Sequence, residues 1–277
     1  MNGNRTIGIA GVGKMGEALV RGLVVGRVVP PSRILVSDAV PQRAKEVATK
    51  YNVEAVSSTA TLAERSDLLV LAAKPKDMPL LVDSIAGHVK KDALVVTLAA
   101  GVRTKFVEKI LKGRGRVVRM MPNLACAVGE GATAFALGST ATDSDALAVE
   151  EMMGGIGRVT KVEEIQLDAV TGLSGSGPGF ISALANFMIE GGVRSGLPKE
   201  VATRLTLQAM KGTAELLLTD GIEPMTLYTM VATPNGTTEA GWKLLESRQV
   251  PQAISDAIVA ASKRAAELAE ETAKAHG

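Results

Sequence analysis

The six residues Gly11-Val12-Gly13-Lys14-Met15-Gly16 constrain the fold of this chain more than any other segment. An apolar stretch at residues 6–10 leads into them and is typical of a buried strand, and residues 17–24 continue in a helical pattern. A G-x-G-x-x-G sequence at such a turn lets the backbone approach a pyrophosphate, while N–H groups at the start of the helix face its negative charge. A tight turn without a ligand is the alternative, but the placement between strand and helix predicts a dinucleotide-binding domain.

The first half of the chain repeats this alternation of strands and helices. Apolar runs predict further strands at residues 34–38, 53–56, 68–73, 94–98 and 116–120, and the segments 132–137 and 158–162 could extend the sheet. The runs are continuously apolar and amphipathic helical patterns separate them, which indicates a parallel sheet covered on both faces. We expect a doubly wound Rossmann-type parallel α/β domain over residues 1–163.

The pattern changes after Glu163-Glu164, where strand-like runs end. Apolar residues then recur at helical spacing over residues 180–188, 201–212 and 254–268. Many of these helix faces carry Ala and Gly, which permits close contact between helices of one chain or of two subunits. We expect an all-helical C-terminal domain over residues 164–277.

Composition and charge exclude several classes of function. The net charge of +2 and the aromatic content of 3% leave neither a basic field nor stacking platforms for nucleic acid. The longest apolar run, residues 93–102, is shorter than the ~20 residues that span a bilayer, and the first strand begins too early for a signal peptide. The single cysteine, Cys126, fits a reducing compartment and excludes a Cys-rich metal site. These observations predict a cytoplasmic protein without a membrane or nucleic-acid partner.

Asp38 is a candidate for contact with the adenosine ribose of the dinucleotide. It ends the second predicted strand, where an acid commonly accepts a hydrogen bond from the ribose 2′-OH. A carboxylate there favours NADH, because it repels the 2′-phosphate of NADPH by on the order of 4 kcal/mol at an effective dielectric near 20. Lys14 and Arg43 could offset that repulsion, and a strand-end cap without ligand contact is also possible, so the choice between NADPH and NADH stays open.

Three further segments follow predicted strands at the edge where ligands of open α/β sheets bind. Ala72-Ala73-Lys74-Pro75 follows the fourth strand, and Pro75 fixes a turn that directs Lys74 toward the crevice, although a solvated lysine is the simpler interpretation. Ala99-Ala100-Gly101 leaves space for a nicotinamide. Asn123 could hydrogen-bond the carboxamide or the ribose. With Gly11, Gly13, Lys14, Met15, Gly16 and Asp38, these segments form the predicted cofactor site.

Two polar turns in the helical half are candidates for holding a small carboxylate. Residues 174–179, Ser-Gly-Ser-Gly-Pro-Gly, open the first long helix, and residues 231–239 lead into another. Turns of this kind present free backbone N–H groups beside hydroxyls, which together would bind an anion. Helix capping alone explains Ser and Thr at most such sites, but two turns of this composition favour a ligand.

These motifs together resemble the Δ1-pyrroline-5-carboxylate reductase family over essentially the whole chain. The resemblance rests on residues 11–19, Ala73-Lys74-Pro75, Ala99-Ala100-Gly101 and residues 118–123. Its most specific parts are residues 172–178 and the segment that begins at residues 233–238 and continues to residue 246. It implies hydride transfer from NADPH or NADH to the imine carbon of L-1-pyrroline-5-carboxylate, giving L-proline. Family usage favours NADPH. It also implies that the helical domain binds substrate and forms a homodimer, which often assembles further.

The resemblance implies roles for residues of both polar turns. Backbone amides of Asn235-Gly236-Thr237 would hold the substrate carboxylate, and the Thr238 hydroxyl would contact the imine nitrogen as the catalytic residue. Gly175, Ser176 and Gly177 would line the same pocket. Orientation of two bound reactants would then matter more than a strong acid.

The chain departs from the family pattern at several positions. Lys14 replaces a common Asn, Gly179-Phe180 an Ala-Tyr pair, Asn235 a Gly, and Trp242 a smaller aliphatic residue. Asn235 tolerates the left-handed backbone of a glycine, so we expect the turn to survive. Asp38-Ala39 stands where many relatives carry a phosphate-friendly residue. Another reductase of this architecture, such as a β-hydroxyacid dehydrogenase or a different cyclic-imine reductase, and a dinucleotide-sensing protein without catalysis are the alternatives.

Overall fold

The computed structural model describes residues 5–276, and the chain forms two compact units. One unit comprises the chain up to Pro178 together with residues from Val259 onward, and the other runs from Gly179 to Ile258. The sequence placed the boundary at residue 163, where strands give way to helices. The first unit extends further because Leu167 is fully buried in a cluster with Met121 of the sheet.

Within the described residues, the first unit holds an eight-stranded sheet in the order β3-β2-β1-β4-β5-β6-β7-β8. The strands are β1 (Ile7–Ala10), β2 (Ile34–Ser37), β3 (Glu54–Ala55), β4 (Leu68–Leu71), β5 (Leu94–Thr97), β6 (Arg116–Met121), β7 (Gly131–Leu137) and β8 (Gly157–Lys161). Every predicted strand is present. The direction predicted for β7 is wrong, because β7 runs antiparallel to β6. The short connection between them, which contains only the 3-10 turn η3 (Leu124–Val128), cannot make the long crossover that a parallel pair needs.

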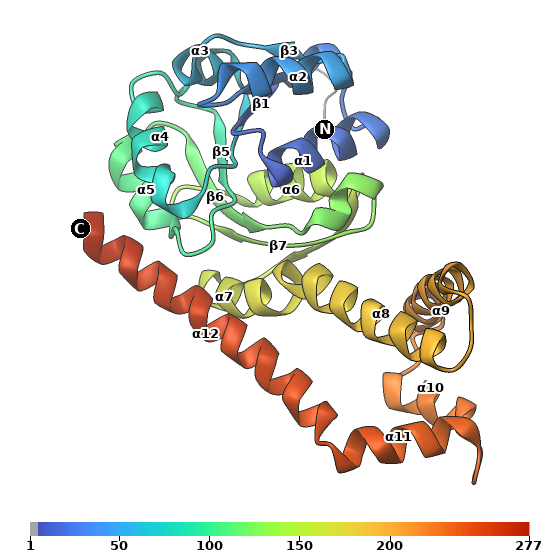
Figure 1. The fold of residues 1–277 in the computed structure, drawn as a ribbon. Helices are drawn as coiled ribbons and strands as arrows, with labels where there is room; N and C mark the ends of the chain where they lie inside the picture. The colour runs from blue at the N-terminus through green and yellow to red at the C-terminus, as the bar shows by residue number, and fades with distance from the viewer. Residues whose placement is uncertain (1–4, 277) are drawn as a thin grey trace. The chain divides into compact units, whose positions relative to one another are not determined.

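Helices cover both faces of this sheet, as the continuously apolar strands predicted. Successive residues of β4 point to opposite faces, so that Leu68 and Val70 join one buried cluster and Leu69 and Leu71 join the other. Helices α1 (Lys14–Val25), α2 (Pro41–Tyr51) and α6 (Asp143–Gly154) pack on the first face. Helices α3 (Thr59–Arg65), α4 (Met78–Ile85) and α5 (Thr104–Leu111) pack on the second (Figure 1). The unit is therefore a doubly wound α/β domain.

The strand order places a topological switch between β1 and β4. The helix after β1 packs on one face, whereas the helix after β4 packs on the other. Ligands of open α/β sheets bind outside the carboxyl ends of strands at such a point. Here these ends lead into Gly11 and Ala72.

The second unit is helical, in agreement with the sequence. It contains most of α8 (Gly177–Arg194), then α9 (Lys199–Asp220), α10 (Pro224–Val231), α11 (Thr237–Ser247) and the first part of α12 (Val250–His276). Helices α8 and α9 approach closely, since a Cβ atom at Gly192 would lie 3.2 Å from the Ala202 Cβ. The aromatic rings of Tyr228 and Trp242 pack with centroids 5.0 Å apart. None of the described helices is long and apolar enough to cross a membrane.

Few side chains of this helical unit are buried by the chain itself. Ala185, Ala202 and Thr206 are the buried residues between Gly179 and Ile258, all of which the structure describes. Large apolar side chains of these helices are exposed, among them Phe187 at 62% and Met188 at 51%. The apolar faces of these helices are therefore available to a partner.

Candidate dinucleotide site and substrate-binding turns

The three glycines of the turn after β1 serve two different purposes. Gly11 adopts φ 93°, and a Cβ atom there would lie 2.9 Å from the carbonyl oxygen of Ala72. A Cβ atom at Gly16 would overlap the carbonyl oxygen of Gly11. Gly13 differs, because no described atom of the chain lies within 4 Å of its Cβ position. Gly11 and Gly16 thus shape the turn, whereas Gly13 leaves open space above it.

The amino end of α1 is suited to an anion. Its N-cap residue is Gly13, and no side chain of the described chain caps the helix. The first N–H groups of a helix have no partner within the helix and carry the positive end of its dipole. Of the two residues between the glycines, Lys14 is exposed and Met15 packs partly against the core. The turn therefore has the open space and the donors that a pyrophosphate requires.

The Asp38 carboxylate accepts a hydrogen bond from the backbone of the glycine turn. Its Oδ2 accepts the Val12 N–H at 2.9 Å, and its Oδ1 accepts the Val40 N–H at 2.9 Å. Arg43 Nη1 lies 3.4 Å from the same Oδ1, and the carboxyl side chain is 7% exposed. The carboxylate thus fastens the end of β2 to the turn after β1, a contact that sequence spacing did not reveal.

The segment after β4 lies beside the glycine turn. The Ala72 N–H donates to the Ala10 carbonyl at 2.8 Å, which continues the pairing of β1 and β4. Ala72 and Ala73 are partly exposed, Lys74 is exposed, and Pro75 begins the 3-10 turn η2 (Pro75–Asp77). Ala72 and Ala73 lie next to Gly11 of the glycine turn.

Gly101 has a packing role that its sequence context did not show. It adopts φ 75°, and a Cβ atom there would lie 2.8 Å from the Ala269 backbone nitrogen of α12. Ala265 and Ala269 of the same helix are buried. The glycine after β5 therefore allows α12 to approach the sheet, in addition to any space it leaves for a nicotinamide.

Both the oxygen and the nitrogen of the Asn123 side-chain amide form hydrogen bonds within the protein. Its Oδ1 accepts the N–H groups of Ala125 and Ala132, each at 3.2 Å, and its Nδ2 donates to the Ser174 carbonyl at 3.1 Å. The residue is 7% exposed. Sequence reasoning placed this amide on the cofactor, whereas the observed contacts join the end of β6 to the Ser/Gly-rich segment.

That Ser/Gly-rich segment is helical and does not form the open turn that the sequence predicted. Residues Thr171–Gly175 form the π-helix η5, between α7 (Leu167–Val170) and α8. The Ser176 N–H and hydroxyl both donate to the Thr171 carbonyl, at 2.9 and 3.0 Å, and the Ser174 hydroxyl donates to the Val170 carbonyl. The prediction of free N–H groups beside hydroxyls is therefore wrong at Ser176, because the wider helical turn uses these groups. Gly175, Ser176 and Gly177 stay together and partly exposed.

A group of four charges, of which Arg119 and Asp168 are buried, anchors the same segment, and sequence reasoning missed it. Arg119 of β6 is fully buried, with Nη2 3.0 Å from Asp168 Oδ1. Arg103 Nη2 lies 2.6 Å from the other Asp168 oxygen, and Glu164 accepts the N–H and the hydroxyl of Thr104. Two cations thus balance two carboxylates, as burial of charge requires. An arginine between the apolar pairs Val117-Val118 and Met120-Met121 was the available signal.

The second polar turn has the backbone predicted for it. Asn235 adopts φ 62°, the left-handed conformation, and the Gly236 N–H donates to the Thr233 carbonyl at 2.9 Å. Glu239 Oε2 accepts the Asn235 N–H at 2.8 Å and lies 3.1 Å from Lys243 Nζ. The Asn235 hydrogen bond, followed by the Lys243 contact, lowers the pKa of Glu239.

The start of α11 presents donors that the chain does not satisfy with side chains. Gly236 is its N-cap, and no side chain caps it within the described part of the protein. Thr237 is exposed, and Thr238 is partly buried. The prediction that the Asn235 and Gly236 N–H groups are free for the substrate carboxylate is wrong, because they donate to Glu239 and to the Thr233 carbonyl. The N–H of Thr237 and the hydroxyls of Thr237 and Thr238 are what this turn can offer to a small anion.

Cys126 is not a reactive group. The residue is fully buried, and burial raises the pKa of its thiol to about 11. A thiol at neutral pH is a poor nucleophile. Cys126 is therefore a packing residue.

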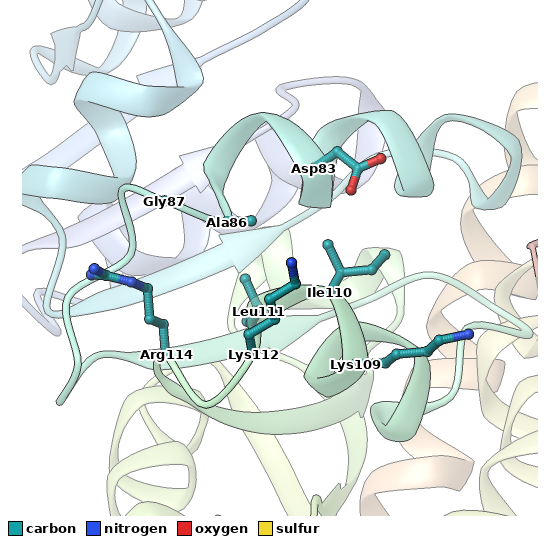
Figure 2. Close-up of a pocket in the computed structure, with 8 residues that line it drawn as sticks. All are labelled: Asp83, Ala86, Gly87, Lys109, Ile110, Leu111, Lys112 and Arg114. Carbon is teal, nitrogen blue, oxygen red and sulfur yellow. The ribbon is translucent and has the colours of Figure 1, made fainter.

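A cavity of about 510 Å³ lies away from these groups, between the carboxyl ends of α4 and α5 (Figure 2). Asp83, Lys109, Lys112 and Arg114 are among the residues that line it. Since α4 leads into β5 and α5 into β6, this cavity is at the amino ends of the strands. It is therefore at the opposite edge of the sheet from the glycine turn.

Comparison with known proteins shows similarity in both halves of the chain. Residues 164–268 match the family described as pyrroline-5-carboxylate reductase dimerisation, and residues 6–101 match the family described as NADP oxidoreductase, coenzyme F420-dependent. The chain is 37% identical to the pyrroline-5-carboxylate reductase of Methanosarcina acetivorans, over 96% of this chain and 98% of that protein. It is 35% identical to the Arabidopsis thaliana enzyme of the same name, over 95% of each. A solved pyrroline-5-carboxylate reductase from Coxiella burnetii superposes with a TM-score of 0.85 at 32% identity, covering 95% of this chain and 98% of that one.

Proposed function

Because this chain belongs to the pyrroline-5-carboxylate reductase family, we propose that it reduces L-1-pyrroline-5-carboxylate to L-proline with a reduced nicotinamide dinucleotide. The observation that carries this proposal is the similarity of both halves to one family over nearly the full chain. The glycine turn alone would not suffice, since many dinucleotide enzymes share it. This activity is the last step of proline biosynthesis.

The residues of the first unit fit the dinucleotide. Open space at Gly13 and the uncapped start of α1 suit the pyrophosphate, while Lys14, Met15 and the segment from Ala72 to Pro75 border the crevice. When bound, the dinucleotide supplies the hydride that adds to the imine carbon. The contribution of the protein is to hold two reactants in the reactive orientation.

Asp38 favours NADH over NADPH in this proposal. Two N–H donors hold its carboxylate at the end of β2, where a ribose 2′-phosphate would meet its negative charge. Arg43, at 3.4 Å, reduces that repulsion without removing the carboxylate. The family's usual preference for NADPH would then be weakened here.

The substrate residues are proposed from the second turn and from the start of α8. N–H groups at the start of α11 would bind the substrate carboxylate, and the Thr238 hydroxyl would hydrogen-bond the imine nitrogen as it gains a proton. Gly175, Ser176 and Gly177 would border the ring. A hydroxyl is a suitable hydrogen-bonding group for the imine nitrogen here, because the chain has only two histidines and neither lies in these segments.

We also propose that the helical unit forms a homodimer, which can assemble further. Large apolar side chains on its helices, such as Phe187 at 62% and Met230 at 66%, are exposed in the single chain. Their burial by a second copy would supply the core that this unit lacks. The matched dimerisation family covers the same residues.

Steady-state kinetics with pyrroline-5-carboxylate and each of NADH and NADPH test the function. We expect turnover with both cofactors and a higher kcat/KM for NADH. Turnover of a β-hydroxyacid or of another cyclic imine, without turnover of pyrroline-5-carboxylate, would refute the assignment. Cofactor binding without turnover of any imine would instead indicate a dinucleotide sensor.

A further inference from the structure

Strand β6 holds the segment of residues 167–175 with side chains from one of its faces. Arg119, Met121 and Asn123 are two residues apart, and Asn123 retains extended backbone at φ −124° and ψ 170°. Alternate residues of extended chain point to the same side. All three therefore face the segment that joins α7 to α8.

Each of the three side chains meets a different part of that segment. Arg119 pairs with Asp168 at 3.0 Å, at the start of α7. Met121 packs with Leu167, and a Cβ atom at Gly175 would lie 3.6 Å from the Met121 Sδ. Asn123 donates to the Ser174 carbonyl, inside the π-helix. The contacts thus fix both ends of the segment against the sheet.

The oxygen of the Asn123 amide is fully committed to contacts within the protein, and one of its two Nδ2 hydrogens is committed as well. Both acceptor positions of its Oδ1 receive backbone N–H groups, from Ala125 and Ala132, and its Nδ2 reaches Ser174. An amide oxygen accepts two hydrogen bonds, so this Oδ1 has none left for a ligand donor. The geometry is that of a structural link.

The π-helical segment that Asn123 contacts needs such a structural link. A π-helical turn is rare and usually occurs as a single turn at a functional site. Here it is Thr171–Gly175, and its last residue, Gly175, together with the next two, Ser176 and Gly177, is proposed to border the substrate. A shift of the π-helix would move these residues without moving the glycine turn after β1.

We propose that Asn123 is a positioning residue for imine reduction, which sets the π-helix and thereby the substrate residues, and that it does not bind the nicotinamide. This inference rests on the proposed function. It assigns to Asn123 an effect on the substrate and none on the dinucleotide.

Asn123→Asp and Asn123→Ser test the inference. The first keeps the acceptor oxygens and removes the Nδ2 donor, and the second keeps a capping oxygen for η3 but is too short to reach Ser174. Three quantities are measured: the Kd of NADH by its fluorescence, kcat and KM for pyrroline-5-carboxylate, and hydrogen exchange of residues 170–178. Met120→Leu, a conservative change on the opposite face of β6, is the matched control.

We expect an unchanged Kd for NADH, a KM for pyrroline-5-carboxylate raised about tenfold or more, and faster exchange over residues 170–178. The control should change none of these. A Kd for NADH that rises in step with the KM would place Asn123 against the cofactor and overturn the inference, as would unaltered exchange in both variants. If the unmodified protein does not reduce pyrroline-5-carboxylate, the proposed function fails, while exchange and NADH binding still decide whether Asn123 orders the segment.

Discussion

At the scale of single residues, the glycines of the first turn predict separable effects on binding and stability. Gly13→Ala adds a methyl group that no described atom opposes, whereas the same change at Gly16 would overlap the Gly11 carbonyl oxygen. We expect Gly13→Ala to raise the Kd of the dinucleotide about tenfold with unchanged thermal stability. Gly16→Ala should lower the free energy of unfolding by about 1–3 kcal/mol. Calorimetric unfolding and cofactor titration measure the two effects, and equal cofactor affinity in Gly13→Ala would show that the space is not used by the pyrophosphate.

The charge of Asp38 is expected to set the cofactor preference. Asp38→Ser removes a carboxylate whose repulsion of a 2′-phosphate is on the order of 4 kcal/mol before solvent screening, so kcat/KM with NADPH should rise about tenfold relative to NADH. Asp38→Asn is the matched control for the hydrogen bond to Val12, because it keeps an acceptor and removes the charge. Both variants should raise kcat/KM with NADPH relative to kcat/KM with NADH. An NADH-to-NADPH ratio equal to that of the unmodified protein in both would show that the carboxylate does not face the ribose.

Thr238 is expected to contribute through its hydroxyl. Thr238→Ala should lower kcat by about tenfold or more, in line with the usual size of proton-transfer contributions, because the imine nitrogen loses its hydrogen-bond partner. Thr238→Ser keeps the hydroxyl and should retain most of the activity. Kinetics of the three proteins at saturating cofactor make the comparison, and equal kcat values would remove Thr238 from the mechanism.

At the scale of elements, the start of α8 offers a matched pair of glycines. Neither Gly177 nor Gly179 has a described atom within 4 Å of its Cβ position, so alanine fits both and favours the helix. Only Gly177 belongs to the proposed substrate site. We expect Gly177→Ala to raise the KM for pyrroline-5-carboxylate about tenfold, because the methyl group would take space from the substrate, and Gly179→Ala to leave it unchanged. Equal KM values for the two variants would move the substrate away from Gly177.

The elements also show why some local structure could be read from the sequence and some could not. Continuous apolar runs predicted the central strands β1, β2, β4 and β5, since a strand buried on both faces admits few polar residues. The π-helix at Thr171–Gly175 was not predicted, because its extra residue per turn depends on contacts with β6 and not on the composition of the segment. For the same reason Asn123, Asp38 and Gly101 acquired partners that no sequence spacing indicated.

At the scale of the whole molecule, the exposed apolar helices predict that the chain associates with further copies of itself, so that its assembly depends on protein concentration. Phe187→Lys places a charge on a side chain that is 62% exposed in the single chain, so the single chain tolerates the change. In a dimer it would cost about 2 kcal/mol or more for each copy, and we expect a smaller assembly by sedimentation velocity. Leu80→Lys, at a 76% exposed position on α4, is the control and should leave the assembly intact. An unchanged assembly in Phe187→Lys would place the subunit interface elsewhere.

The sequence by itself determined the doubly wound sheet, the helical second half, the glycine turn and the family. These depend on short-range patterns: apolar periodicity, glycine at a strand-to-helix turn, and motif order. Only the tertiary structure decided the extension of the first unit to Pro178 and the buried pairing of Arg119 with Asp168. It also decided the contacts of Asp38 and Asn123. Such features join residues far apart along the chain, and the free energy that selects them comes from packing and hydrogen bonds formed only when distant segments meet.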